Sequence, residues 1–274
     1  MIEENRSGSN QQESSLHQSP SAKAIHHAIF LEAETELERP SSALFWSGLA
    51  AGLSMGFSMI AEGLLMAYLP DAHWSTLVSN FGYSLGFLIV ILGKQQLFTE
   101  NTLTPILPLL HKKNGATLWN VLRLWGIVLF ANLLGALVIA LVSAHTTAFD
   151  AHVMSAFSKI GHKAMEQDFS AVLVRGIFAG WLIALMVWLL PYAQSARVWV
   201  IIFITYIVGV GHFSHVVAGA VETFTLAAME QATWWSVSVN YILPALIGNV
   251  IGGVILVAAL NHAQITTGEK AGYF

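Results

Sequence analysis

The sequence predicts an all-α membrane protein with six transmembrane helices arranged as two inverted three-helix repeats. Three observations predict this class. Of the 274 residues, 55% are apolar and only 10% are charged, too few charges to cover a water-soluble globule of this size. Apolar passages of about 20 residues or more, long enough to cross a bilayer, occur six times. Short glycine and asparagine patterns recur in the same order in both halves of the chain.

The polar ends of the chain are expected to lie outside the membrane. Residues 1–40 are rich in Ser, Gln and Glu and lack the apolar core of a secretory signal. We interpret them as a partly disordered cytoplasmic tail, with a short amphipathic helix predicted from about residue 24 to 39 that carries Ile25, Ile29 and Leu37 on one face. A solvated tail with no function of its own is the simpler interpretation and the one that we favour. We expect residues 41–263 to form the transmembrane domain and residues 264–274 to form a second cytoplasmic tail.

Two of the six apolar passages are too long for one straight crossing. In chain order the passages are 44–69, 77–110, 118–144, 171–192, 198–229 and 241–263. The second contains the polar stretch GKQQLFTENT at 93–102, and the fifth contains GHFSHVVAG at 211–219. We predict that both helices are broken there. Non-helical backbone at membrane depth is tolerated only where protein buries it or where it lines a cavity.

Lysine and arginine placement predicts the orientation. One side of the predicted membrane domain carries most of these residues, namely Arg6, Lys23, Arg39, Lys112, Lys113, Arg197 and Lys270, with Arg123 just inside the third helix. The opposite side carries only Lys159 and Lys163, with Arg175 just inside the fourth helix. Because positive charges favour the cytoplasmic side, both termini are expected to be cytoplasmic.

The internal symmetry rests on four short patterns. The first and fourth passages each contain a Gly-x-x-x-Gly pair, and the third and sixth each contain Asn-x-x-Gly; the residues are Gly48, Gly52, Gly176, Gly180, Asn132, Gly135, Asn249 and Gly252. Small residues at this spacing allow close helix packing, so we interpret the asparagine motifs as packing devices. With three passages in each half, the two halves must have opposite topology, and the broken helices then approach the midplane from opposite sides.

The two breaks contain the candidate functional side chains. Half-helices that meet in a membrane direct backbone amides at the gap between them, which suits a small anion. Leu97 and Phe98 offer an apolar constriction, and Thr99 offers a hydroxyl that either binds an anion or caps the helix starting near Glu100. An ionisable group in a membrane break is costly, which favours a functional His215, whereas a structural role is favoured for His212.

Three charged residues lie within or beside these passages: Glu62, Lys94 and Arg175. Each is expected either to pair with an opposite charge or to face a water-filled vestibule. We hypothesise that Lys94 or Arg175 adds positive potential along the path of an anion.

Together, GKQQLFTENT, HFSHVVAG and GNVIGG resemble the formate/nitrite transporter family over about residues 41–262. The resemblance implies an aquaporin-like fold, a homopentamer with one pore per protomer, a bacterial inner membrane, and a small monovalent anion such as formate or nitrite as cargo. By the same resemblance His215, preceded by Phe213, matches the central pore histidine, and residues 97–99 match the loop that gates the pore. Lys163 is the nearest equivalent of the vestibule lysine, with a slip of about one residue.

The chain also departs from this family pattern. Gly180 stands where the family usually carries an Asn in the fourth helix, and Gly219 replaces the Asn that commonly follows the histidine. Glu62, Arg175 and Lys94 are additional charges.

Three alternatives stay open. The first is a channel for another small solute, such as hydrosulfide, ammonia or water, on the same scaffold. The second is a membrane-embedded metal hydrolase that uses His212 and His215, although HExxH is absent and only Glu222 is a nearby carboxylate. The third is a non-transporting structural or regulatory membrane protein. For the favoured interpretation we expect no enzymatic activity, no metal, no cofactor and no nucleic-acid partner, since no basic stripe is present.

Overall fold

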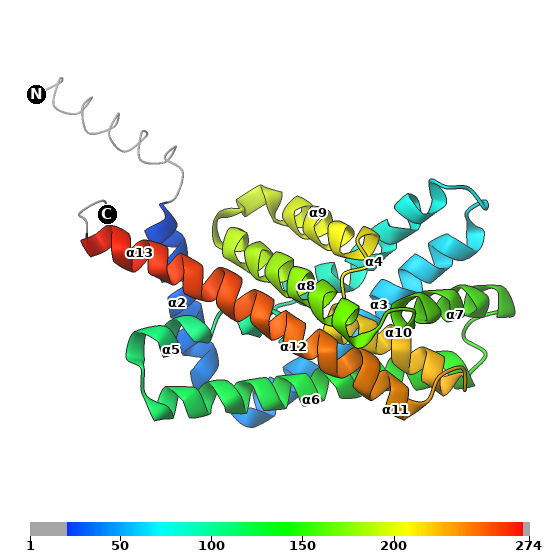
Figure 1. Cartoon of the computed structure of the whole chain (residues 1–274), viewed down its shortest axis with the longest axis horizontal. Coiled ribbons are helices and arrows are strands. Elements are labelled where there is room, and N and C mark those ends of the chain that lie inside the picture. Colours follow the sequence, from blue (N-terminus) through cyan, green and yellow to red (C-terminus); the bar gives the residue numbers. More distant parts are fainter. Residues whose placement is uncertain (1–20, 271–274) are drawn as a thin grey trace, which may run out of the picture.

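A computed structural model describes residues 21–270, and every regular element in that range is a helix (Figure 1). Five helices of the described chain are long and apolar enough to cross a membrane. They are α3 (Ser41–Tyr68), α4 (Ser75–Leu92), α6 (Gly115–His145), α8 (Phe169–Leu189) with the short turn that extends it to Tyr192, and a helix from Trp234 to Ile265 that includes α11 (Trp234–Val237) and α12 (Leu243–Ile251). The chain is therefore a multi-pass membrane protein.

The fifth apolar passage forms two shorter helices. These are α9 (Arg197–Val210) and α10 (Val216–Ala228), and the chain between them leaves helical geometry at 211–215. The polar interruption in the second passage is equally visible: α4 ends at Leu92, and a short 3-10 turn at Glu100–Thr102 leads into α5 (Ile106–Lys112). Lys94 and His212, two residues beyond the ends of α4 and α9, adopt positive φ angles of 52° and 49°. The second break is shorter than the sequence stretch suggested, because residues 216–219 already belong to the first turn of α10.

Side-chain caps explain where several helices begin. Asn114 accepts a hydrogen bond from the Thr117 amide at the start of α6 (2.8 Å). Asp150 caps α7 (Ala151–Met165), Asp168 caps α8 and Thr233 caps α11 in the same way. Short polar side chains at these positions satisfy amides that have no partner within the helix.

Close helix contacts define the membrane core. α3 packs against both α4 and α6, and α8 packs against α12 and the π-helical turns at Gly252–Ala259 that follow it. A Cβ atom added to Gly135 would lie 2.6 Å from the backbone nitrogen of Leu53, and one added to Gly252 would lie 2.6 Å from that of Trp181. Glycine is required at both positions because neighbouring backbone occupies the space of a side chain.

The helix preceding the membrane domain is docked onto it. α2 (Ala22–Glu38) packs against α5, α6, α8 and α13 (Leu260–Lys270), and Ile29 and Leu37 are buried on its inner face (Figure 1). The simpler interpretation of a solvated tail is therefore wrong for residues 22–38, since apolar burial holds this segment in place. Residues 1–20 lie outside the described range. At the other end the helix passes residue 263, the expected domain boundary, and continues to Lys270.

Candidate functional site

The two helix breaks meet through one side-chain contact. Thr99 Oγ1 in the first break lies 2.7 Å from His215 Nε2 in the second. Both residues are fully buried. Positions 116 residues apart in the chain are thus joined by a hydrogen bond at the centre of the helix bundle.

His215 also caps the helix that follows it. Its Nδ1 accepts a hydrogen bond from the Ala218 amide (3.1 Å) at the start of α10. An accepting Nδ1 carries no hydrogen, so Nε2 carries the ring proton and donates to Thr99 Oγ1 in the neutral tautomer. Thr99 itself makes no capping hydrogen bond at the start of the Glu100–Thr102 turn. Of its two predicted roles, the cap is therefore absent and the hydroxyl faces the imidazole instead.

Asn132 and Asn249 hold the two breaks in equivalent ways. Asn132 Oδ1 accepts from the Phe98 amide (2.9 Å), and its Nδ2 donates to the carbonyls of Gly48 (2.7 Å) and Gln96 (2.9 Å). Each asparagine satisfies backbone groups that the break has removed from helical pairing.

The contacts of Asn249 repeat this arrangement in the second half. Its Oδ1 accepts from the Val216 amide (2.9 Å), and its Nδ2 donates to the carbonyls of Gly176 and Ser214 (both 2.8 Å). Both asparagines are fully buried. They were predicted as helix-packing residues, but no sequence pattern indicated that they bond to the breaks.

The two glycines that depart from the family pattern have steric explanations. A Cβ on Gly180 would overlap the Asn249 carbonyl oxygen, and a Cβ on Gly219 would overlap the Tyr241 hydroxyl. Gly52 faces the Asn132 carbonyl oxygen in the same manner as Gly180 faces Asn249. Gly180 is thus part of the repeated close packing, and at position 219 the tyrosine ring occupies the space that a side chain would need.

Aromatic and aliphatic side chains surround the Thr99–His215 contact. Leu97 and Phe98 are buried, and the Phe87 ring meets the His215 ring edge to face at 4.9 Å. Phe213, which is half-buried, stacks on Phe178 at 5.4 Å between ring centres. An ion at this point would find few polar partners besides the hydroxyl and imidazole.

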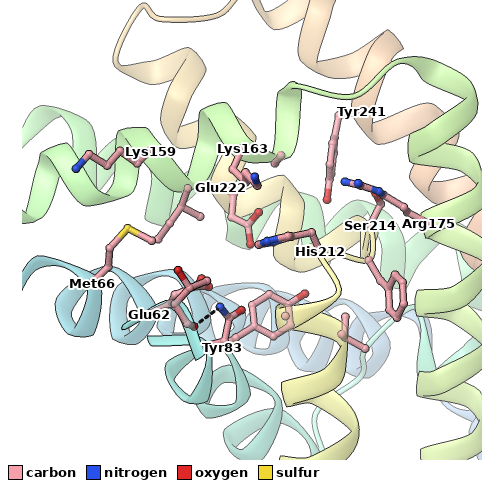
Figure 2. A pocket seen from close by; sticks show the side chains of 17 residues that line it. Glu62, Met66, Tyr83, Lys159, Lys163, Arg175, His212, Ser214, Glu222 and Tyr241 are labelled. Carbon is pink, nitrogen blue, oxygen red and sulfur yellow. Dashed lines mark hydrogen bonds between the residues drawn. The ribbon is translucent and has the colours of Figure 1, made fainter. Parts of the chain in front are cut away.

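A cavity of about 270 Å³ lies next to the second break (Figure 2). Phe213 and Ser214, which immediately precede His215, form part of its wall. Its basic side chains are Lys159, Lys163, Arg175 and His212, and its acidic side chains are Glu62 and Glu222. His212, for which a packing role was favoured, is exposed and lines this cavity. Glu62 and Arg175 face the same space, as expected for charges beside a vestibule.

A second cavity of about 330 Å³ lies at the other end of α4 and α9. Thr76 and Gly209 line the first cavity, whereas Ile91 and Arg197 line the second. The second cavity is bordered by the first break and by α2, through Glu32, Glu36, Lys94, Gln96 and Glu100. Lys94 forms an exposed ion pair with Glu32 of α2 at 2.9 Å. It lies at the rim of this cavity and does not reach the Thr99–His215 contact.

Several residues of this region were missed in the sequence. Asn80 and Tyr83 of α4, Ser214 of the second break and Tyr241 before α12 line the first cavity, yet these polar side chains had no distinctive spacing in the sequence. Glu222 was considered only as a metal partner. An acidic residue in the middle of the apolar segment 216–228 was a usable signal, because such residues face a bundle interior or a cavity.

Known proteins resemble this chain along most of its length. Residues 23–263 match the family described as "Formate/nitrite transporter". Inner membrane protein YfdC of Escherichia coli is 41% identical over 89% of this chain and 79% of that protein, and the formate channel BtFdhC of Bacillus thuringiensis is 28% identical over 74% and 78%. A solved structure titled "Pentameric formate channel with formate bound" matches with a TM-score of 0.71 at 20% identity, over 82% of this chain and 98% of that one.

The family match spans both breaks, both asparagines and both cavities, and its members are channels and transporters, not enzymes. With the transmembrane helices described above, it shows that this chain is a member of the formate/nitrite transporter family.

Proposed function

We propose that the protein is a channel or transporter for small monovalent anions of the formate or nitrite class. The solute path runs through each protomer, from one cavity past His215 and Thr99 to the other. The single observation that carries this proposal is the buried Thr99–His215 hydrogen bond, since it places a donor and a hydroxyl at the junction of two helix breaks. The cavities at opposite ends of α4 and α9 support it.

The proposed topology has six crossings in two inverted three-helix repeats with an aquaporin-like fold, both termini being cytoplasmic in a bacterial inner membrane. The equivalent hydrogen bonds of Asn132 and Asn249 support the repeat. The proposed assembly is a homopentamer with one path per protomer, supported by the pentameric formate channel of similar fold.

An anion that reaches the Thr99–His215 contact must lose most of its water. Removing a charged carboxylate from water without compensation costs several kcal/mol or more. Two routes lower this barrier: basic groups and hydrogen-bond donors stabilise the anion, or the anion takes up a proton and crosses as the neutral acid. The proposed path has elements of both, with Leu97, Phe98, Phe213 and Thr99 at the constriction and Lys94, Lys163 and Arg175 at the cavities.

The test is solute flux in proteoliposomes that contain the purified protein. The panel is formate, nitrite, acetate, lactate, chloride and hydrosulfide, with water and ammonia flux as separate assays for the alternatives. We expect formate or nitrite to move fastest. Wild-type protein that transports none of the anions would contradict the proposal.

Two variants of the central histidine sharpen the test. His215→Ala removes the donor and the cap of α10, and we expect flux to be abolished. His215→Asn keeps a capping oxygen but does not titrate, so we expect folded protein with altered flux and pH dependence. His73→Ala, in an exposed loop, is the matched control. Wild-type rate and pH profile in both His215 variants would remove His215 from the path.

A further inference from the structure

Two acidic side chains in the first cavity have no part in the function proposed above. Glu62 of α3 and Glu222 of α10 are 7% and 9% exposed. Both carboxyl groups point into the cavity (Figure 2). Among the described residues, neither makes a hydrogen bond or an ion pair, although Lys159, Lys163 and Arg175 line the same cavity. Close packing fixes the positions of both glutamates: Gly82 of α4 lies against the backbone of Glu62, and Gly161 of α7 lies against that of Glu222.

A third acceptor in this cavity is also unpaired. Asn80 is 1% exposed, and its Nδ2 donates to the Thr76 carbonyl (2.7 Å). Its Oδ1 is buried and accepts no hydrogen bond within the described chain. That oxygen lies toward Gly209, which lines the cavity from the opposite helix. A buried acceptor without a partner is unfavourable, so a donor that reached this oxygen would be stabilising.

The remaining ionisable groups of the cavity come from the other elements packed around the two glutamates. They are Tyr83 of α4, Lys159 and Lys163 of α7, Arg175 of α8, His212 of the second break and Tyr241 before α12. α6 packs against both α3 and α10 and contributes no residue to the cavity lining. The cavity therefore has basic groups from α7, α8 and the break, and acidic groups from α3 and α10.

Charge repulsion and desolvation limit how these acids can exist. A carboxylate without an ion-pair partner at membrane depth is expensive, and two carboxylates that share one cavity repel each other, so ionising both costs more than ionising one. A protonated carboxyl group, in contrast, is itself a hydrogen-bond donor. With protons on Glu62 and Glu222, these two unpaired carboxyl groups could donate hydrogen bonds within the cavity.

We propose that Glu62 and Glu222 form a proton-loading pair that protonates the anion before it enters the constriction. In this step the O–H bond of one glutamic acid breaks, an O–H bond forms on the bound carboxylate, and formate leaves as formic acid. The glutamate that remains carries the negative charge, which the basic groups of the cavity stabilise. A hydronium ion from the bulk solution then gives a proton to the glutamate and leaves as water, which restores the pair. This inference rests on the proposed function, since it requires an anionic cargo.

The position of the pair fits this order of events. Lys159, Lys163 and Arg175 attract the anion into the cavity, where Glu62 and Glu222 supply the proton. The constriction follows directly, because Tyr83 of the cavity wall lies 5.5 Å from the Phe87 ring, which lies 4.9 Å from that of His215. A neutral acid crosses such an apolar region at much lower cost than its anion.

The test combines infrared spectroscopy with flux. In wild-type protein at pH 7 we expect a carboxylic-acid C=O band that the double variant Glu62→Gln/Glu222→Gln lacks. Glutamine is nearly isosteric with glutamic acid and carries no transferable proton. In proteoliposomes we expect the double variant to take up formate about a hundredfold more slowly at pH 7, the usual scale of a lost general acid, with a flattened pH profile. Glu230→Gln, an exposed residue just beyond the end of α10, is the matched control.

Each outcome decides the proposal. Absence of the acid band in wild-type protein overturns it, whether or not the variants fold. Wild-type uptake and pH profile in the double variant also overturn it, because the two protonated acids would then be structural only. Loss of uptake together with loss of the band supports it, provided that Glu230→Gln behaves as wild type. If wild-type protein carries no anion, the proposed function fails separately from the infrared result.

Discussion

The two helix breaks share a backbone scaffold but differ in chemistry. In both, an asparagine side chain accepts from one backbone amide and donates to the carbonyl two residues earlier. Asn132 bonds in this way to the Phe98 amide and the Gln96 carbonyl. Asn249 bonds to the Val216 amide and the Ser214 carbonyl. Between each bonded pair stands one residue, which is Leu97 in the first break and His215 in the second. The same backbone position therefore presents an apolar side chain in one half and the imidazole in the other.

The chain that follows each break differs as well. After the second, α10 is a regular 13-residue helix capped by His215 and buried along most of its length. After the first, the chain makes a 3-residue turn and a 7-residue helix, with Thr99 turned to the histidine. The duplicated scaffold thus holds the backbone of both breaks, while the neighbouring side chains determine the chemistry of each break.

The strongest test of this equivalence is to remove each asparagine. Asn132→Ala and Asn249→Ala each delete three hydrogen bonds and leave three backbone groups buried without partners. At about 1–3 kcal/mol per orphaned group, we expect each variant to lose roughly 3 kcal/mol or more of stability, by similar amounts. Thermal unfolding in detergent measures this, with Asn240→Ala on the surface as the control. Strongly unequal losses would break the equivalence of the two halves.

A smaller effect is expected at a position that belongs to the second half alone. Gly219→Ala places a methyl group against the Tyr241 hydroxyl, so overpacking of about 1–3 kcal/mol outweighs the gain of about 1 kcal/mol in helix propensity. Removing that hydroxyl with Tyr241→Phe should recover part of the stability in the double variant, a coupling that a double-mutant cycle detects. Gly115→Ala, where nothing lies within 4 Å of the added Cβ, is the matched control. Additive losses would show that the hydroxyl does not restrict this site.

The Thr99 hydroxyl is expected to contribute about 1–2 kcal/mol. Thr99→Val keeps the shape but leaves the Nε2 hydrogen of His215 buried without an acceptor. Thr99→Ser keeps the acceptor and is the control. We expect Thr99→Val to lower both thermal stability and formate flux, and Thr99→Ser to preserve most of each. Equal behaviour of the two variants would mean that the contact contributes only shape.

Much of this architecture could be predicted from the sequence. Apolar length located the five long membrane helices, because lipid leaves the backbone no hydrogen-bond partner outside the helix. The interruptions at 93–102 and 211–219 located the breaks, and the Gly-x-x-x-Gly and Asn-x-x-Gly patterns located close helix contacts. Thr99 and His215 were chosen because polar groups are costly at membrane depth.

The remaining features depend on tertiary contacts that no local pattern encodes. The partner of Thr99 lies 116 residues away, and the partners of Asn132 and Asn249 are backbone groups. The docking of α2 was underestimated because its apolar face is narrow and its exposed face is strongly charged. The contact between Tyr241 and Gly219 was not predicted, because the side chain that fills the space beside Gly219 comes from another helical segment.

The smallest expected effect is that of removing one lysine from each of the two cavities. Lys94 forms an exposed ion pair with Glu32 at 2.9 Å, whereas Lys163 lies 3.7 Å from Glu166 and shares its cavity with Lys159 and Arg175. Exposed pairs contribute about 0–1 kcal/mol, so neither Lys94→Gln nor Lys163→Gln should change thermal stability measurably.

Their effects on flux should differ, because the carboxylate that offsets Lys94 is closer (2.9 Å against 3.7 Å) and Lys163 shares its cavity with two further basic residues. At low ionic strength we expect Lys163→Gln to slow formate uptake severalfold and Lys94→Gln to change it little. Added salt should reduce that difference, since screening over about 10 Å at 0.1 M weakens the attraction of exposed charges for an anion. Uptake measured against salt concentration checks this. Equal slowing by both variants would mean that the two cavities attract the anion alike, and that the asymmetry between the halves is confined to the breaks.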